Sequence, residues 1–145
     1  MATDAVIESR VAGTVSTTLK LVYGIVPIVA GLDKFTNLLV QWDKYIAPAV
    51  AKILPFSGHT LMYIVGIIEI VAGIGVLTPR WTRVFAIIVG IWLLGIALNL
   101  ILAGFYDIAV RDIVMAVSAF CLARLSAVVP LRVPERDARV TTSAA

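Results

Sequence analysis

One uninterrupted apolar run, Thr60 to Leu77, constrains the fold of this chain more than any other feature. Its eighteen residues, TLMYIVGIIEIVAGIGVL, include a single ionisable side chain, Glu69. At a rise of about 1.5 Å per residue, a helix of this length is roughly 27 Å long, close to the ~30 Å hydrocarbon thickness of a bilayer. The run therefore predicts a transmembrane helix. An acid near its middle must face protein or water and needs a partner or a proton.

The composition of the rest of the chain also indicates an integral membrane protein. Hydrophobic residues, glycine not counted, make up 61% of the 145 residues, and the mean hydropathy is +1.02. Soluble domains contain only about 45–50% apolar residues even with glycine included. We predict one all-α domain, a four-helix bundle that crosses the membrane at about 12–34, 60–77, 84–104 and 108–129, followed by a polar tail over 131–145.

The segment from Asn37 to His59, between the first two spans, mixes apolar residues with charges, prolines and aromatic rings. Aromatic side chains beside charges are typical of the headgroup zone, so we predict an interfacial helical segment; a simple exposed loop is the alternative. Eight Lys and Arg fall on the side of both termini and of the turn PRWTR, and four fall on the other side. The positive-inside rule therefore predicts that both termini are cytoplasmic.

Two octapeptides resemble each other, GIVPIVAG at 24–31 and GIIEIVAG at 66–73. Glycines seven residues apart fall on one helix face and let two backbones approach closely, so we expect the first two spans to cross there. The alternative is a chance recurrence of residues that are common in membrane helices.

The chain contains one cysteine, Cys121, and one histidine, His59. It therefore cannot build an internal disulfide, a CxxC redox pair or a multi-histidine metal site within one chain. We expect no covalent cofactor and no independent catalysis. The cations form no continuous run and lie at span ends, which favours the lipid bilayer, and not nucleic acid, as the partner.

Most intramembrane polar groups fall in the half of the membrane opposite the termini. Glu69 lies roughly 13 Å below the outer end of its span, and Asn99, Arg111 and Asp112 lie about 5 to 7 Å below the outer ends of theirs. With His59 at the outer boundary, these five are the candidate binding residues. We predict an outward-facing polar pocket with Glu69 as its floor and Arg111 as its counter-charge.

Each candidate also has a plainer structural interpretation. Arg111 could pair with Asp107 one helix turn earlier, and Asp112 could cap the helix or pair locally. Glu69 could be protonated and hydrogen-bonded to a backbone carbonyl, and Asn99 could hold two helices together. The single histidine could simply start a helix at the interface.

Short motifs make the chain similar to a known family. The first span carries Lys20, Gly24, Gly31 and Lys34, the second has the form GxxExxxGxGVL followed by TPRWTR, and the fourth opens on the dipeptide RD. Over about residues 20–125 this pattern resembles the DoxX and DoxX-like family of small four-helix bacterial membrane proteins. The resemblance implies a location in the bacterial cytoplasmic membrane, and Glu69 with the Arg111–Asp112 pair are the positions it singles out.

The resemblance also implies a function, because the namesake of the family looks like a small subunit of a thiosulfate:quinone oxidoreductase. We expect an accessory subunit of a membrane oxidoreductase or electron-transfer complex, with other membrane subunits as partners and quinone as the small molecule that its polar pocket contacts. Two other classes stay open. One is a small proton- or ion-coupled transporter that uses Glu69, and the other is a purely structural subunit of a larger membrane assembly.

Overall fold

In the computed structural model, which describes residues 2–128, every regular element is a helix. The four long helices are α1 (Ala2–Thr36), α3 (Gly58–Leu77), α4 (Thr82–Leu102) and α5 (Tyr106–Val128). A connector over residues 37–57 contains the 3-10 helix η1 (Trp42–Tyr45) and the short helix α2 (Pro48–Ile53). The prediction of an all-α fold is confirmed, and the connector has helical turns. The predicted polar tail lies outside the described residues.

Three of the long helices, α3, α4 and the part of α1 from Val6 to Thr36, are long and apolar enough to cross a membrane. Large apolar side chains stand exposed along them, for example Ile67 at 55% and Ile91 at 61%. Lipid as the surrounding solvent accounts for this exposure. The helix α5, with 23 residues, has a similar length but carries more charged side chains than α3 or α4. The orientation of the termini stays a prediction from the cation count.

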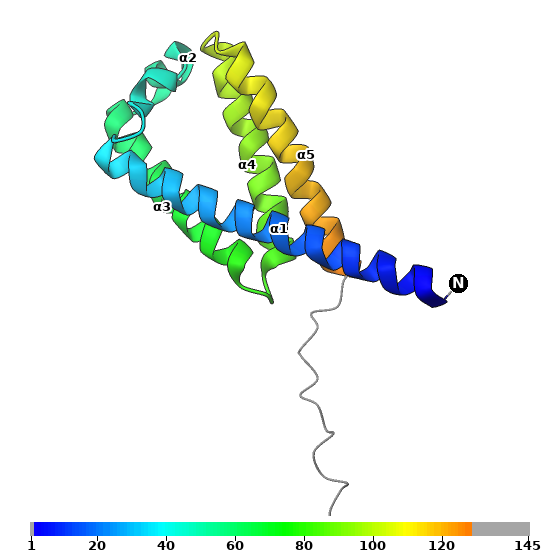
Figure 1. The fold of residues 1–145 in the computed structure, drawn as a ribbon. Coiled ribbons are helices and arrows are strands. Elements are labelled where there is room, and N and C mark those ends of the chain that lie inside the picture. The colour runs from blue at the N-terminus through cyan, green and yellow to red at the C-terminus, as the bar shows by residue number, and fades with distance from the viewer. Residues whose placement is uncertain (1, 129–145) are drawn as a thin grey trace, which may run out of the picture.

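The long helices form two antiparallel pairs, α1 with α3 and α4 with α5 (Figure 1). We call the end that carries the connector and the α4–α5 turn the outer end, and the end with the α3–α4 turn the inner end. The pairs lie close together toward the inner end and diverge toward the outer end (Figure 1). The described parts of α1 and α5 thus begin and end on the same side of the bundle.

The helices α1 and α3 meet at a glycine crossing formed by Gly24, Gly31, Gly66 and Gly73. A Cβ atom added to Gly31 would lie 2.5 Å from the carbonyl oxygen of Gly66, and one on Gly66 would lie 2.7 Å from that of Gly31. Gly73 approaches the carbonyl oxygen of Gly24 in the same way. The first glycine of each octapeptide therefore meets the last glycine of the other, and the predicted crossing of these two spans is confirmed.

A buried apolar core joins the two pairs in the inner half of the bundle. It includes Tyr23 of α1, Val76 of α3, Val89 of α4 and Leu122 of α5. The hydroxyl of Tyr23 donates a hydrogen bond of 2.6 Å to the carbonyl oxygen of Met115, so a polar contact ties α1 to α5 inside this core. The polar residues of the outer half are thereby held at a fixed position above a packed apolar base.

Candidate functional site

Glu69 forms a buried ion pair with Lys34. The ammonium group of Lys34 donates a hydrogen bond of 2.6 Å to Oε2 of Glu69, and the two side chains are only 4% and 11% exposed. Removing one partner of such a pair leaves an uncompensated charge in a low-dielectric environment. The pair therefore links α1 and α3 through a contact in which each charge depends on the other.

The glycine crossing explains why these two residues meet. Lys34 follows Gly31 by three residues and Glu69 follows Gly66 by three residues, so each charge lies one helix turn from the closest backbone contact. Side chains on a helix lean toward its N-terminus. Because α1 and α3 are antiparallel, Lys34 leans inward and Glu69 leans outward, and the two side chains approach each other.

Trp42 of the connector covers Lys34 on the outer side. The Lys34 ammonium lies 3.8 Å from the centroid of the Trp42 ring, a cation–π contact. The indole N–H of Trp42 donates a hydrogen bond of 2.8 Å to Asp33, whose other carboxylate oxygen accepts bonds of 2.9 Å from the backbone N–H groups of Leu38 and Leu39. Asp33 thus shapes the turn after α1 and fixes the indole ring above the ion pair.

This arrangement differs from the predicted open pocket. The side chain of Glu69 is close to fully buried, and the connector folds over the outer end of the ion pair. One carboxylate oxygen of Asp33 accepts hydrogen bonds from two backbone N–H groups that follow α1. These bonds allow the chain to reverse its direction directly after the helix. That reversal brings Trp42 back onto the helix that precedes it.

The prediction that Arg111 is the counter-charge of Glu69 is wrong. Its side chain is 62% exposed, and both Nε and Nη2 lie 2.9 Å from Oδ1 of Asp112, which is itself buried. Adjacent residues on an α-helix point about 100° apart, so only one of the two can face the interior. Among the described ion pairs, Arg111 does not pair with Asp107. The local pairing considered for Asp112 is confirmed.

Asp112 places another buried carboxyl group in the outer half of the bundle. It is 3% exposed on α5, between one and two helix turns from the outer start of that helix. With Asp33, which is also buried, the interior of the outer half of the described chain therefore contains one cation and three carboxyl groups. We call Lys34, Glu69, Asp112 and the covering Trp42 the Lys34 cluster.

Asn99 holds the connector against α4. Its side-chain amide donates a hydrogen bond of 2.7 Å to the carbonyl oxygen of Tyr45, and its oxygen accepts one of 3.0 Å from the backbone N–H of Ala47. Ala47 is fully buried, and the ring of Tyr45 packs edge-on against Phe105 at a centroid distance of 5.0 Å. Asn99 therefore contacts the backbone of the connector and does not join the Lys34 cluster.

His59 lies in the first turn of α3, at the exposed rim of the connector. Its Nδ1 is 3.3 Å from Oδ2 of Asp43, and its Nε2 is 2.7 Å from the hydroxyl of Tyr63. The Tyr63 ring stacks on Phe35 at a centroid distance of 5.1 Å. The histidine thus joins the connector to α3 on the surface and lies outside the Lys34 cluster.

Of the five predicted site residues, Arg111 and Asp112 contact each other, and Glu69, Asn99 and His59 each contact other parts of the chain. The structure adds Lys34 and Trp42 to the candidate site. The spacing of Lys34 from Gly31, which equals that of Glu69 from Gly66, is a sequence signal that could have identified the lysine. Nothing in the sequence indicates the position of Trp42, because it depends on how the chain reverses after α1.

The Lys34 cluster combines groups that can donate hydrogen bonds, hold protons and stack against a flat ligand. Lys34 presents an ammonium donor, Glu69 and Asp112 present carboxyl groups, and Trp42 presents an aromatic surface. Within residues 2–128 no group of three or more His, Cys, Asp or Glu side chains is arranged to hold a metal ion. The chemistry available to these residues is proton exchange and the recognition of polar oxygen atoms.

A protein-family model matches more than half of the chain. The sequence model of the DoxX family matches residues 16–104, which include most of α1, the connector, α3 and α4. The match covers Lys34, Trp42, Glu69 and Asn99, and it ends before Asp112. Comparisons with curated proteins and with solved structures gave no match.

Proposed function

The chain belongs to the DoxX family of membrane proteins, and from this premise we propose that it is an accessory subunit of an oxidoreductase or electron-transfer complex in the bacterial cytoplasmic membrane. We further propose that its Lys34 cluster contacts a quinone. The chain would supply the contact surface, and other membrane subunits would supply the redox centres.

The observation that supports this proposal is the buried Lys34–Glu69 ion pair beneath Trp42. Burying two charges is costly, and apolar side chains of similar volume often give equal or greater stability. Ionisable groups at membrane depth usually have a function for this reason. Lys34 also lies in the last turn of α1, near the outer boundary where an amphipathic ligand would enter.

The residues of the cluster fit a quinone by their chemistry. A bound quinone would supply the reversible uptake of two electrons and two protons. Lys34 would donate a hydrogen bond to a ring oxygen, Glu69 and Asp112 would hold protons nearby, and Trp42 would shield the site from water. Electrons would have to come from another subunit, because the described residues offer no metal-binding group of three and contain one free cysteine.

A charge-free variant tests the quinone contact. The double variant Lys34→Met, Glu69→Leu removes both charges together and so avoids leaving one of them unpaired. Protein purified from native membranes in a mild detergent is extracted with organic solvent, and its quinone content is measured. We expect the natural protein to retain quinone and the double variant to lose it. Equal quinone content in the two proteins would refute the contact.

The partners that purify with the protein test the subunit role separately. We expect redox subunits to accompany both the natural protein and the double variant, because the double variant changes only side chains buried between α1 and α3. Isolation of the natural protein without a redox partner would contradict this role. The quinone measurement and the partner measurement can therefore fail independently.

A second candidate function is proton- or ion-coupled transport. The buried carboxyl group of Asp112, in the same half of the bundle as the Lys34–Glu69 pair, favours it, because buried ionisable groups at membrane depth often form proton relays. Flux in liposomes that disappears in Glu69→Gln would support this alternative, and unchanged flux would remove it. If the double variant has normal assembly, activity and quinone content, the purely structural role is the remaining one.

A further inference from the structure

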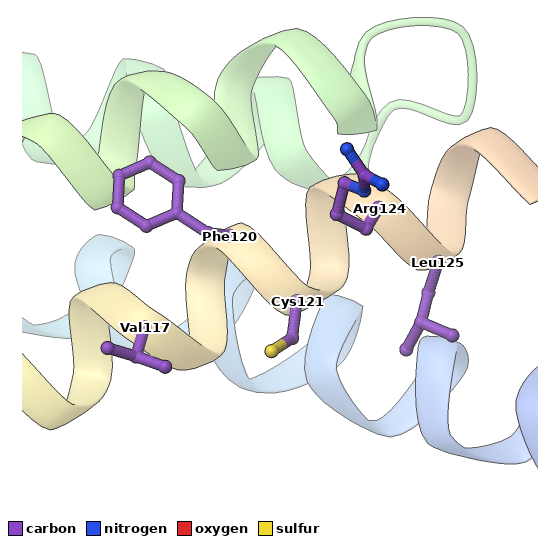
Figure 2. A pocket seen from close by; sticks show the side chains of 5 residues that line it. All are labelled: Val117, Phe120, Cys121, Arg124 and Leu125. Atoms are coloured by element: carbon purple, nitrogen blue, oxygen red, sulfur yellow. The ribbon is translucent and has the colours of Figure 1, made fainter.

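The inner half of α5 carries an apolar hollow with a cation at one end. It is lined by Val117, Phe120, Cys121, Arg124 and Leu125 (Figure 2). The hydrocarbon parts of these side chains form its walls, and the thiol of Cys121 is exposed. We call it the α5 hollow. It is separate from the Lys34 cluster, which lies nearer the outer end.

The packing of Phe120 forms one wall of the α5 hollow. Its ring points toward α4, whereas Val117, Cys121 and Leu125 point to the other side of α5 (Figure 2). The ring fits there because α4 has a glycine at position 90; a Cβ on Gly90 would lie 2.7 Å from Cε1 of Phe120. The wall is therefore held by helix packing and does not depend on an exposed loop.

Arg124 gives the α5 hollow a positive charge that has no counter-charge in the described part of the chain. Its side chain is exposed, and the ion pairs found among the described side chains do not include it. Arg80 and Arg83 of the α3–α4 turn are also exposed at the inner end. An anion in the headgroup zone would be attracted to this end of the bundle.

We propose that the α5 hollow binds one phospholipid, with an acyl chain along the apolar wall and an anionic headgroup on Arg124. From Val117 to Leu125 a helix rises about 12 Å, most of the ~15 Å depth of one hydrocarbon leaflet. An apolar helix of a partner would leave the arginine without a counter-charge. A lipid with an anionic headgroup matches both the apolar wall and the positive charge.

Cys121 provides a direct readout, because it is the only cysteine of the chain and lies in the hollow. The full-length protein is placed in vesicles of phosphatidylcholine alone or with increasing phosphatidylglycerol, and the rate of alkylation by N-ethylmaleimide is measured. We expect phosphatidylglycerol to slow the alkylation. Arg124→Gln should raise the phosphatidylglycerol concentration needed for half of this protection about fivefold, which corresponds to about 1 kcal/mol.

Two further variants distinguish lipid binding in the α5 hollow from a general electrostatic attraction of anionic lipids to the inner end of the bundle. Arg83→Gln removes a cation from the same end without touching the hollow and should leave the protection of Cys121 unchanged. Cys121→Trp fills the hollow and keeps Arg124, so the amount of phosphatidylglycerol that remains bound after detergent washing should fall, as measured by mass spectrometry. Equal effects of Arg83→Gln and Arg124→Gln, or unchanged retention in Cys121→Trp, would overturn the proposal.

Other occupants give different results. If the acids of the 131–145 segment pair with Arg124, the full-length variant Glu135→Gln, Asp137→Asn should alkylate faster in phosphatidylcholine alone, which would contradict lipid binding. If a second protein chain covers the hollow, Cys121 should be equally protected in both kinds of vesicle, which would also contradict it. Circular dichroism of each variant checks that the helices are retained.

Discussion

The ammonium nitrogen of Lys34 lies 2.6 Å from Oε2 of Glu69, across the interface of two antiparallel helices whose backbones are in near contact. Each residue stands one helix turn from a glycine that permits this approach. The electrostatic contact and the close backbone packing therefore depend on each other, and substitutions in either should affect both. The predictions that follow separate the contributions of the charges, the glycines and the connector.

Single substitutions of the ion pair should destabilise the protein far more than the double substitution. Lys34→Met or Glu69→Leu leaves one buried charge unpaired and should cost about 3 to 5 kcal/mol of unfolding free energy, whereas the combined variant should lie close to the natural protein. Unfolding of the purified protein in mixed micelles, followed by near-ultraviolet circular dichroism during a titration with sodium dodecyl sulfate, measures the difference. A double variant no more stable than either single variant would contradict the pairing.

Alanine at Gly66 should disrupt the glycine crossing. The added Cβ would meet the carbonyl oxygen of Gly31 at 2.7 Å, and a backbone atom cannot move aside as a flexible side chain can. We expect a loss of about 1 to 3 kcal/mol, typical of overpacking. Gly95→Ala is the matched control, because a Cβ there has no neighbour within 4 Å and alanine favours the helix. The same unfolding titration compares the two, and equal stability of both variants would argue against the crossing.

Replacement of Asn99 by leucine should release the connector from α4. The substitution removes the bonds to the half-buried Tyr45 and the buried Ala47 and leaves two backbone groups without these partners, at a combined cost of about 1 to 3 kcal/mol. Hydrogen–deuterium exchange should rise over residues 42–54 and change little in α4 itself. Ser118→Ala, which removes an exposed bond within α5, serves as the control. Unchanged exchange in the connector of the leucine variant would show that Asn99 does not hold it.

Loss of the Trp42 ring should expose Lys34 to reagents. In Trp42→Ala the cation–π contact and the bond to Asp33 both disappear, so the acetylation rate of Lys34 by acetic anhydride should increase several-fold. Trp42→Phe keeps an aromatic ring but loses the indole donor, and it should give an intermediate rate. Lys44, whose ammonium lies 4.8 Å from the Tyr45 ring centroid, provides the internal reference within each sample. Equal labelling of Lys34 in all three proteins would show that the tryptophan does not shield it.

The sequence predicts where the helices begin and end better than it predicts which way a side chain points around each helix. The apolar run at 60–77 agrees closely with α3, Gly58–Leu77, because length and hydropathy suffice to define such a helix. The same counting assigned Arg111 and Asp112 similar depths but could not tell which of them faces the interior. Lys34 is the last residue of the span predicted from the sequence, 12–34. Only the packing of the helices shows that its side chain leans back toward Glu69.

The connector was the least predictable part of the site. Its mixture of charges and aromatic rings correctly indicated helical turns, but the roles of its residues depend on single hydrogen bonds. The carboxylate of Asp33 organises the turn after α1. The side-chain amide of Asn99 donates one hydrogen bond to the backbone of the connector and accepts another from it, although the two segments are about fifty residues apart in the sequence. Such contacts between distant segments follow from the folded chain and have no local sequence pattern.

The glycine crossing bears on why the outer and inner halves of the α1–α3 pair differ in charge. A half-turn rotation about an axis in the membrane plane exchanges the two octapeptides, so Gly24 takes the place of Gly66 and Gly31 that of Gly73. The same rotation carries Glu69 onto Pro27 and Lys34 onto Val76. The glycine contacts of this joint are therefore reciprocal, and the exchange of Glu69 for Pro27 and of Lys34 for Val76 leaves the ion pair in the outer half only.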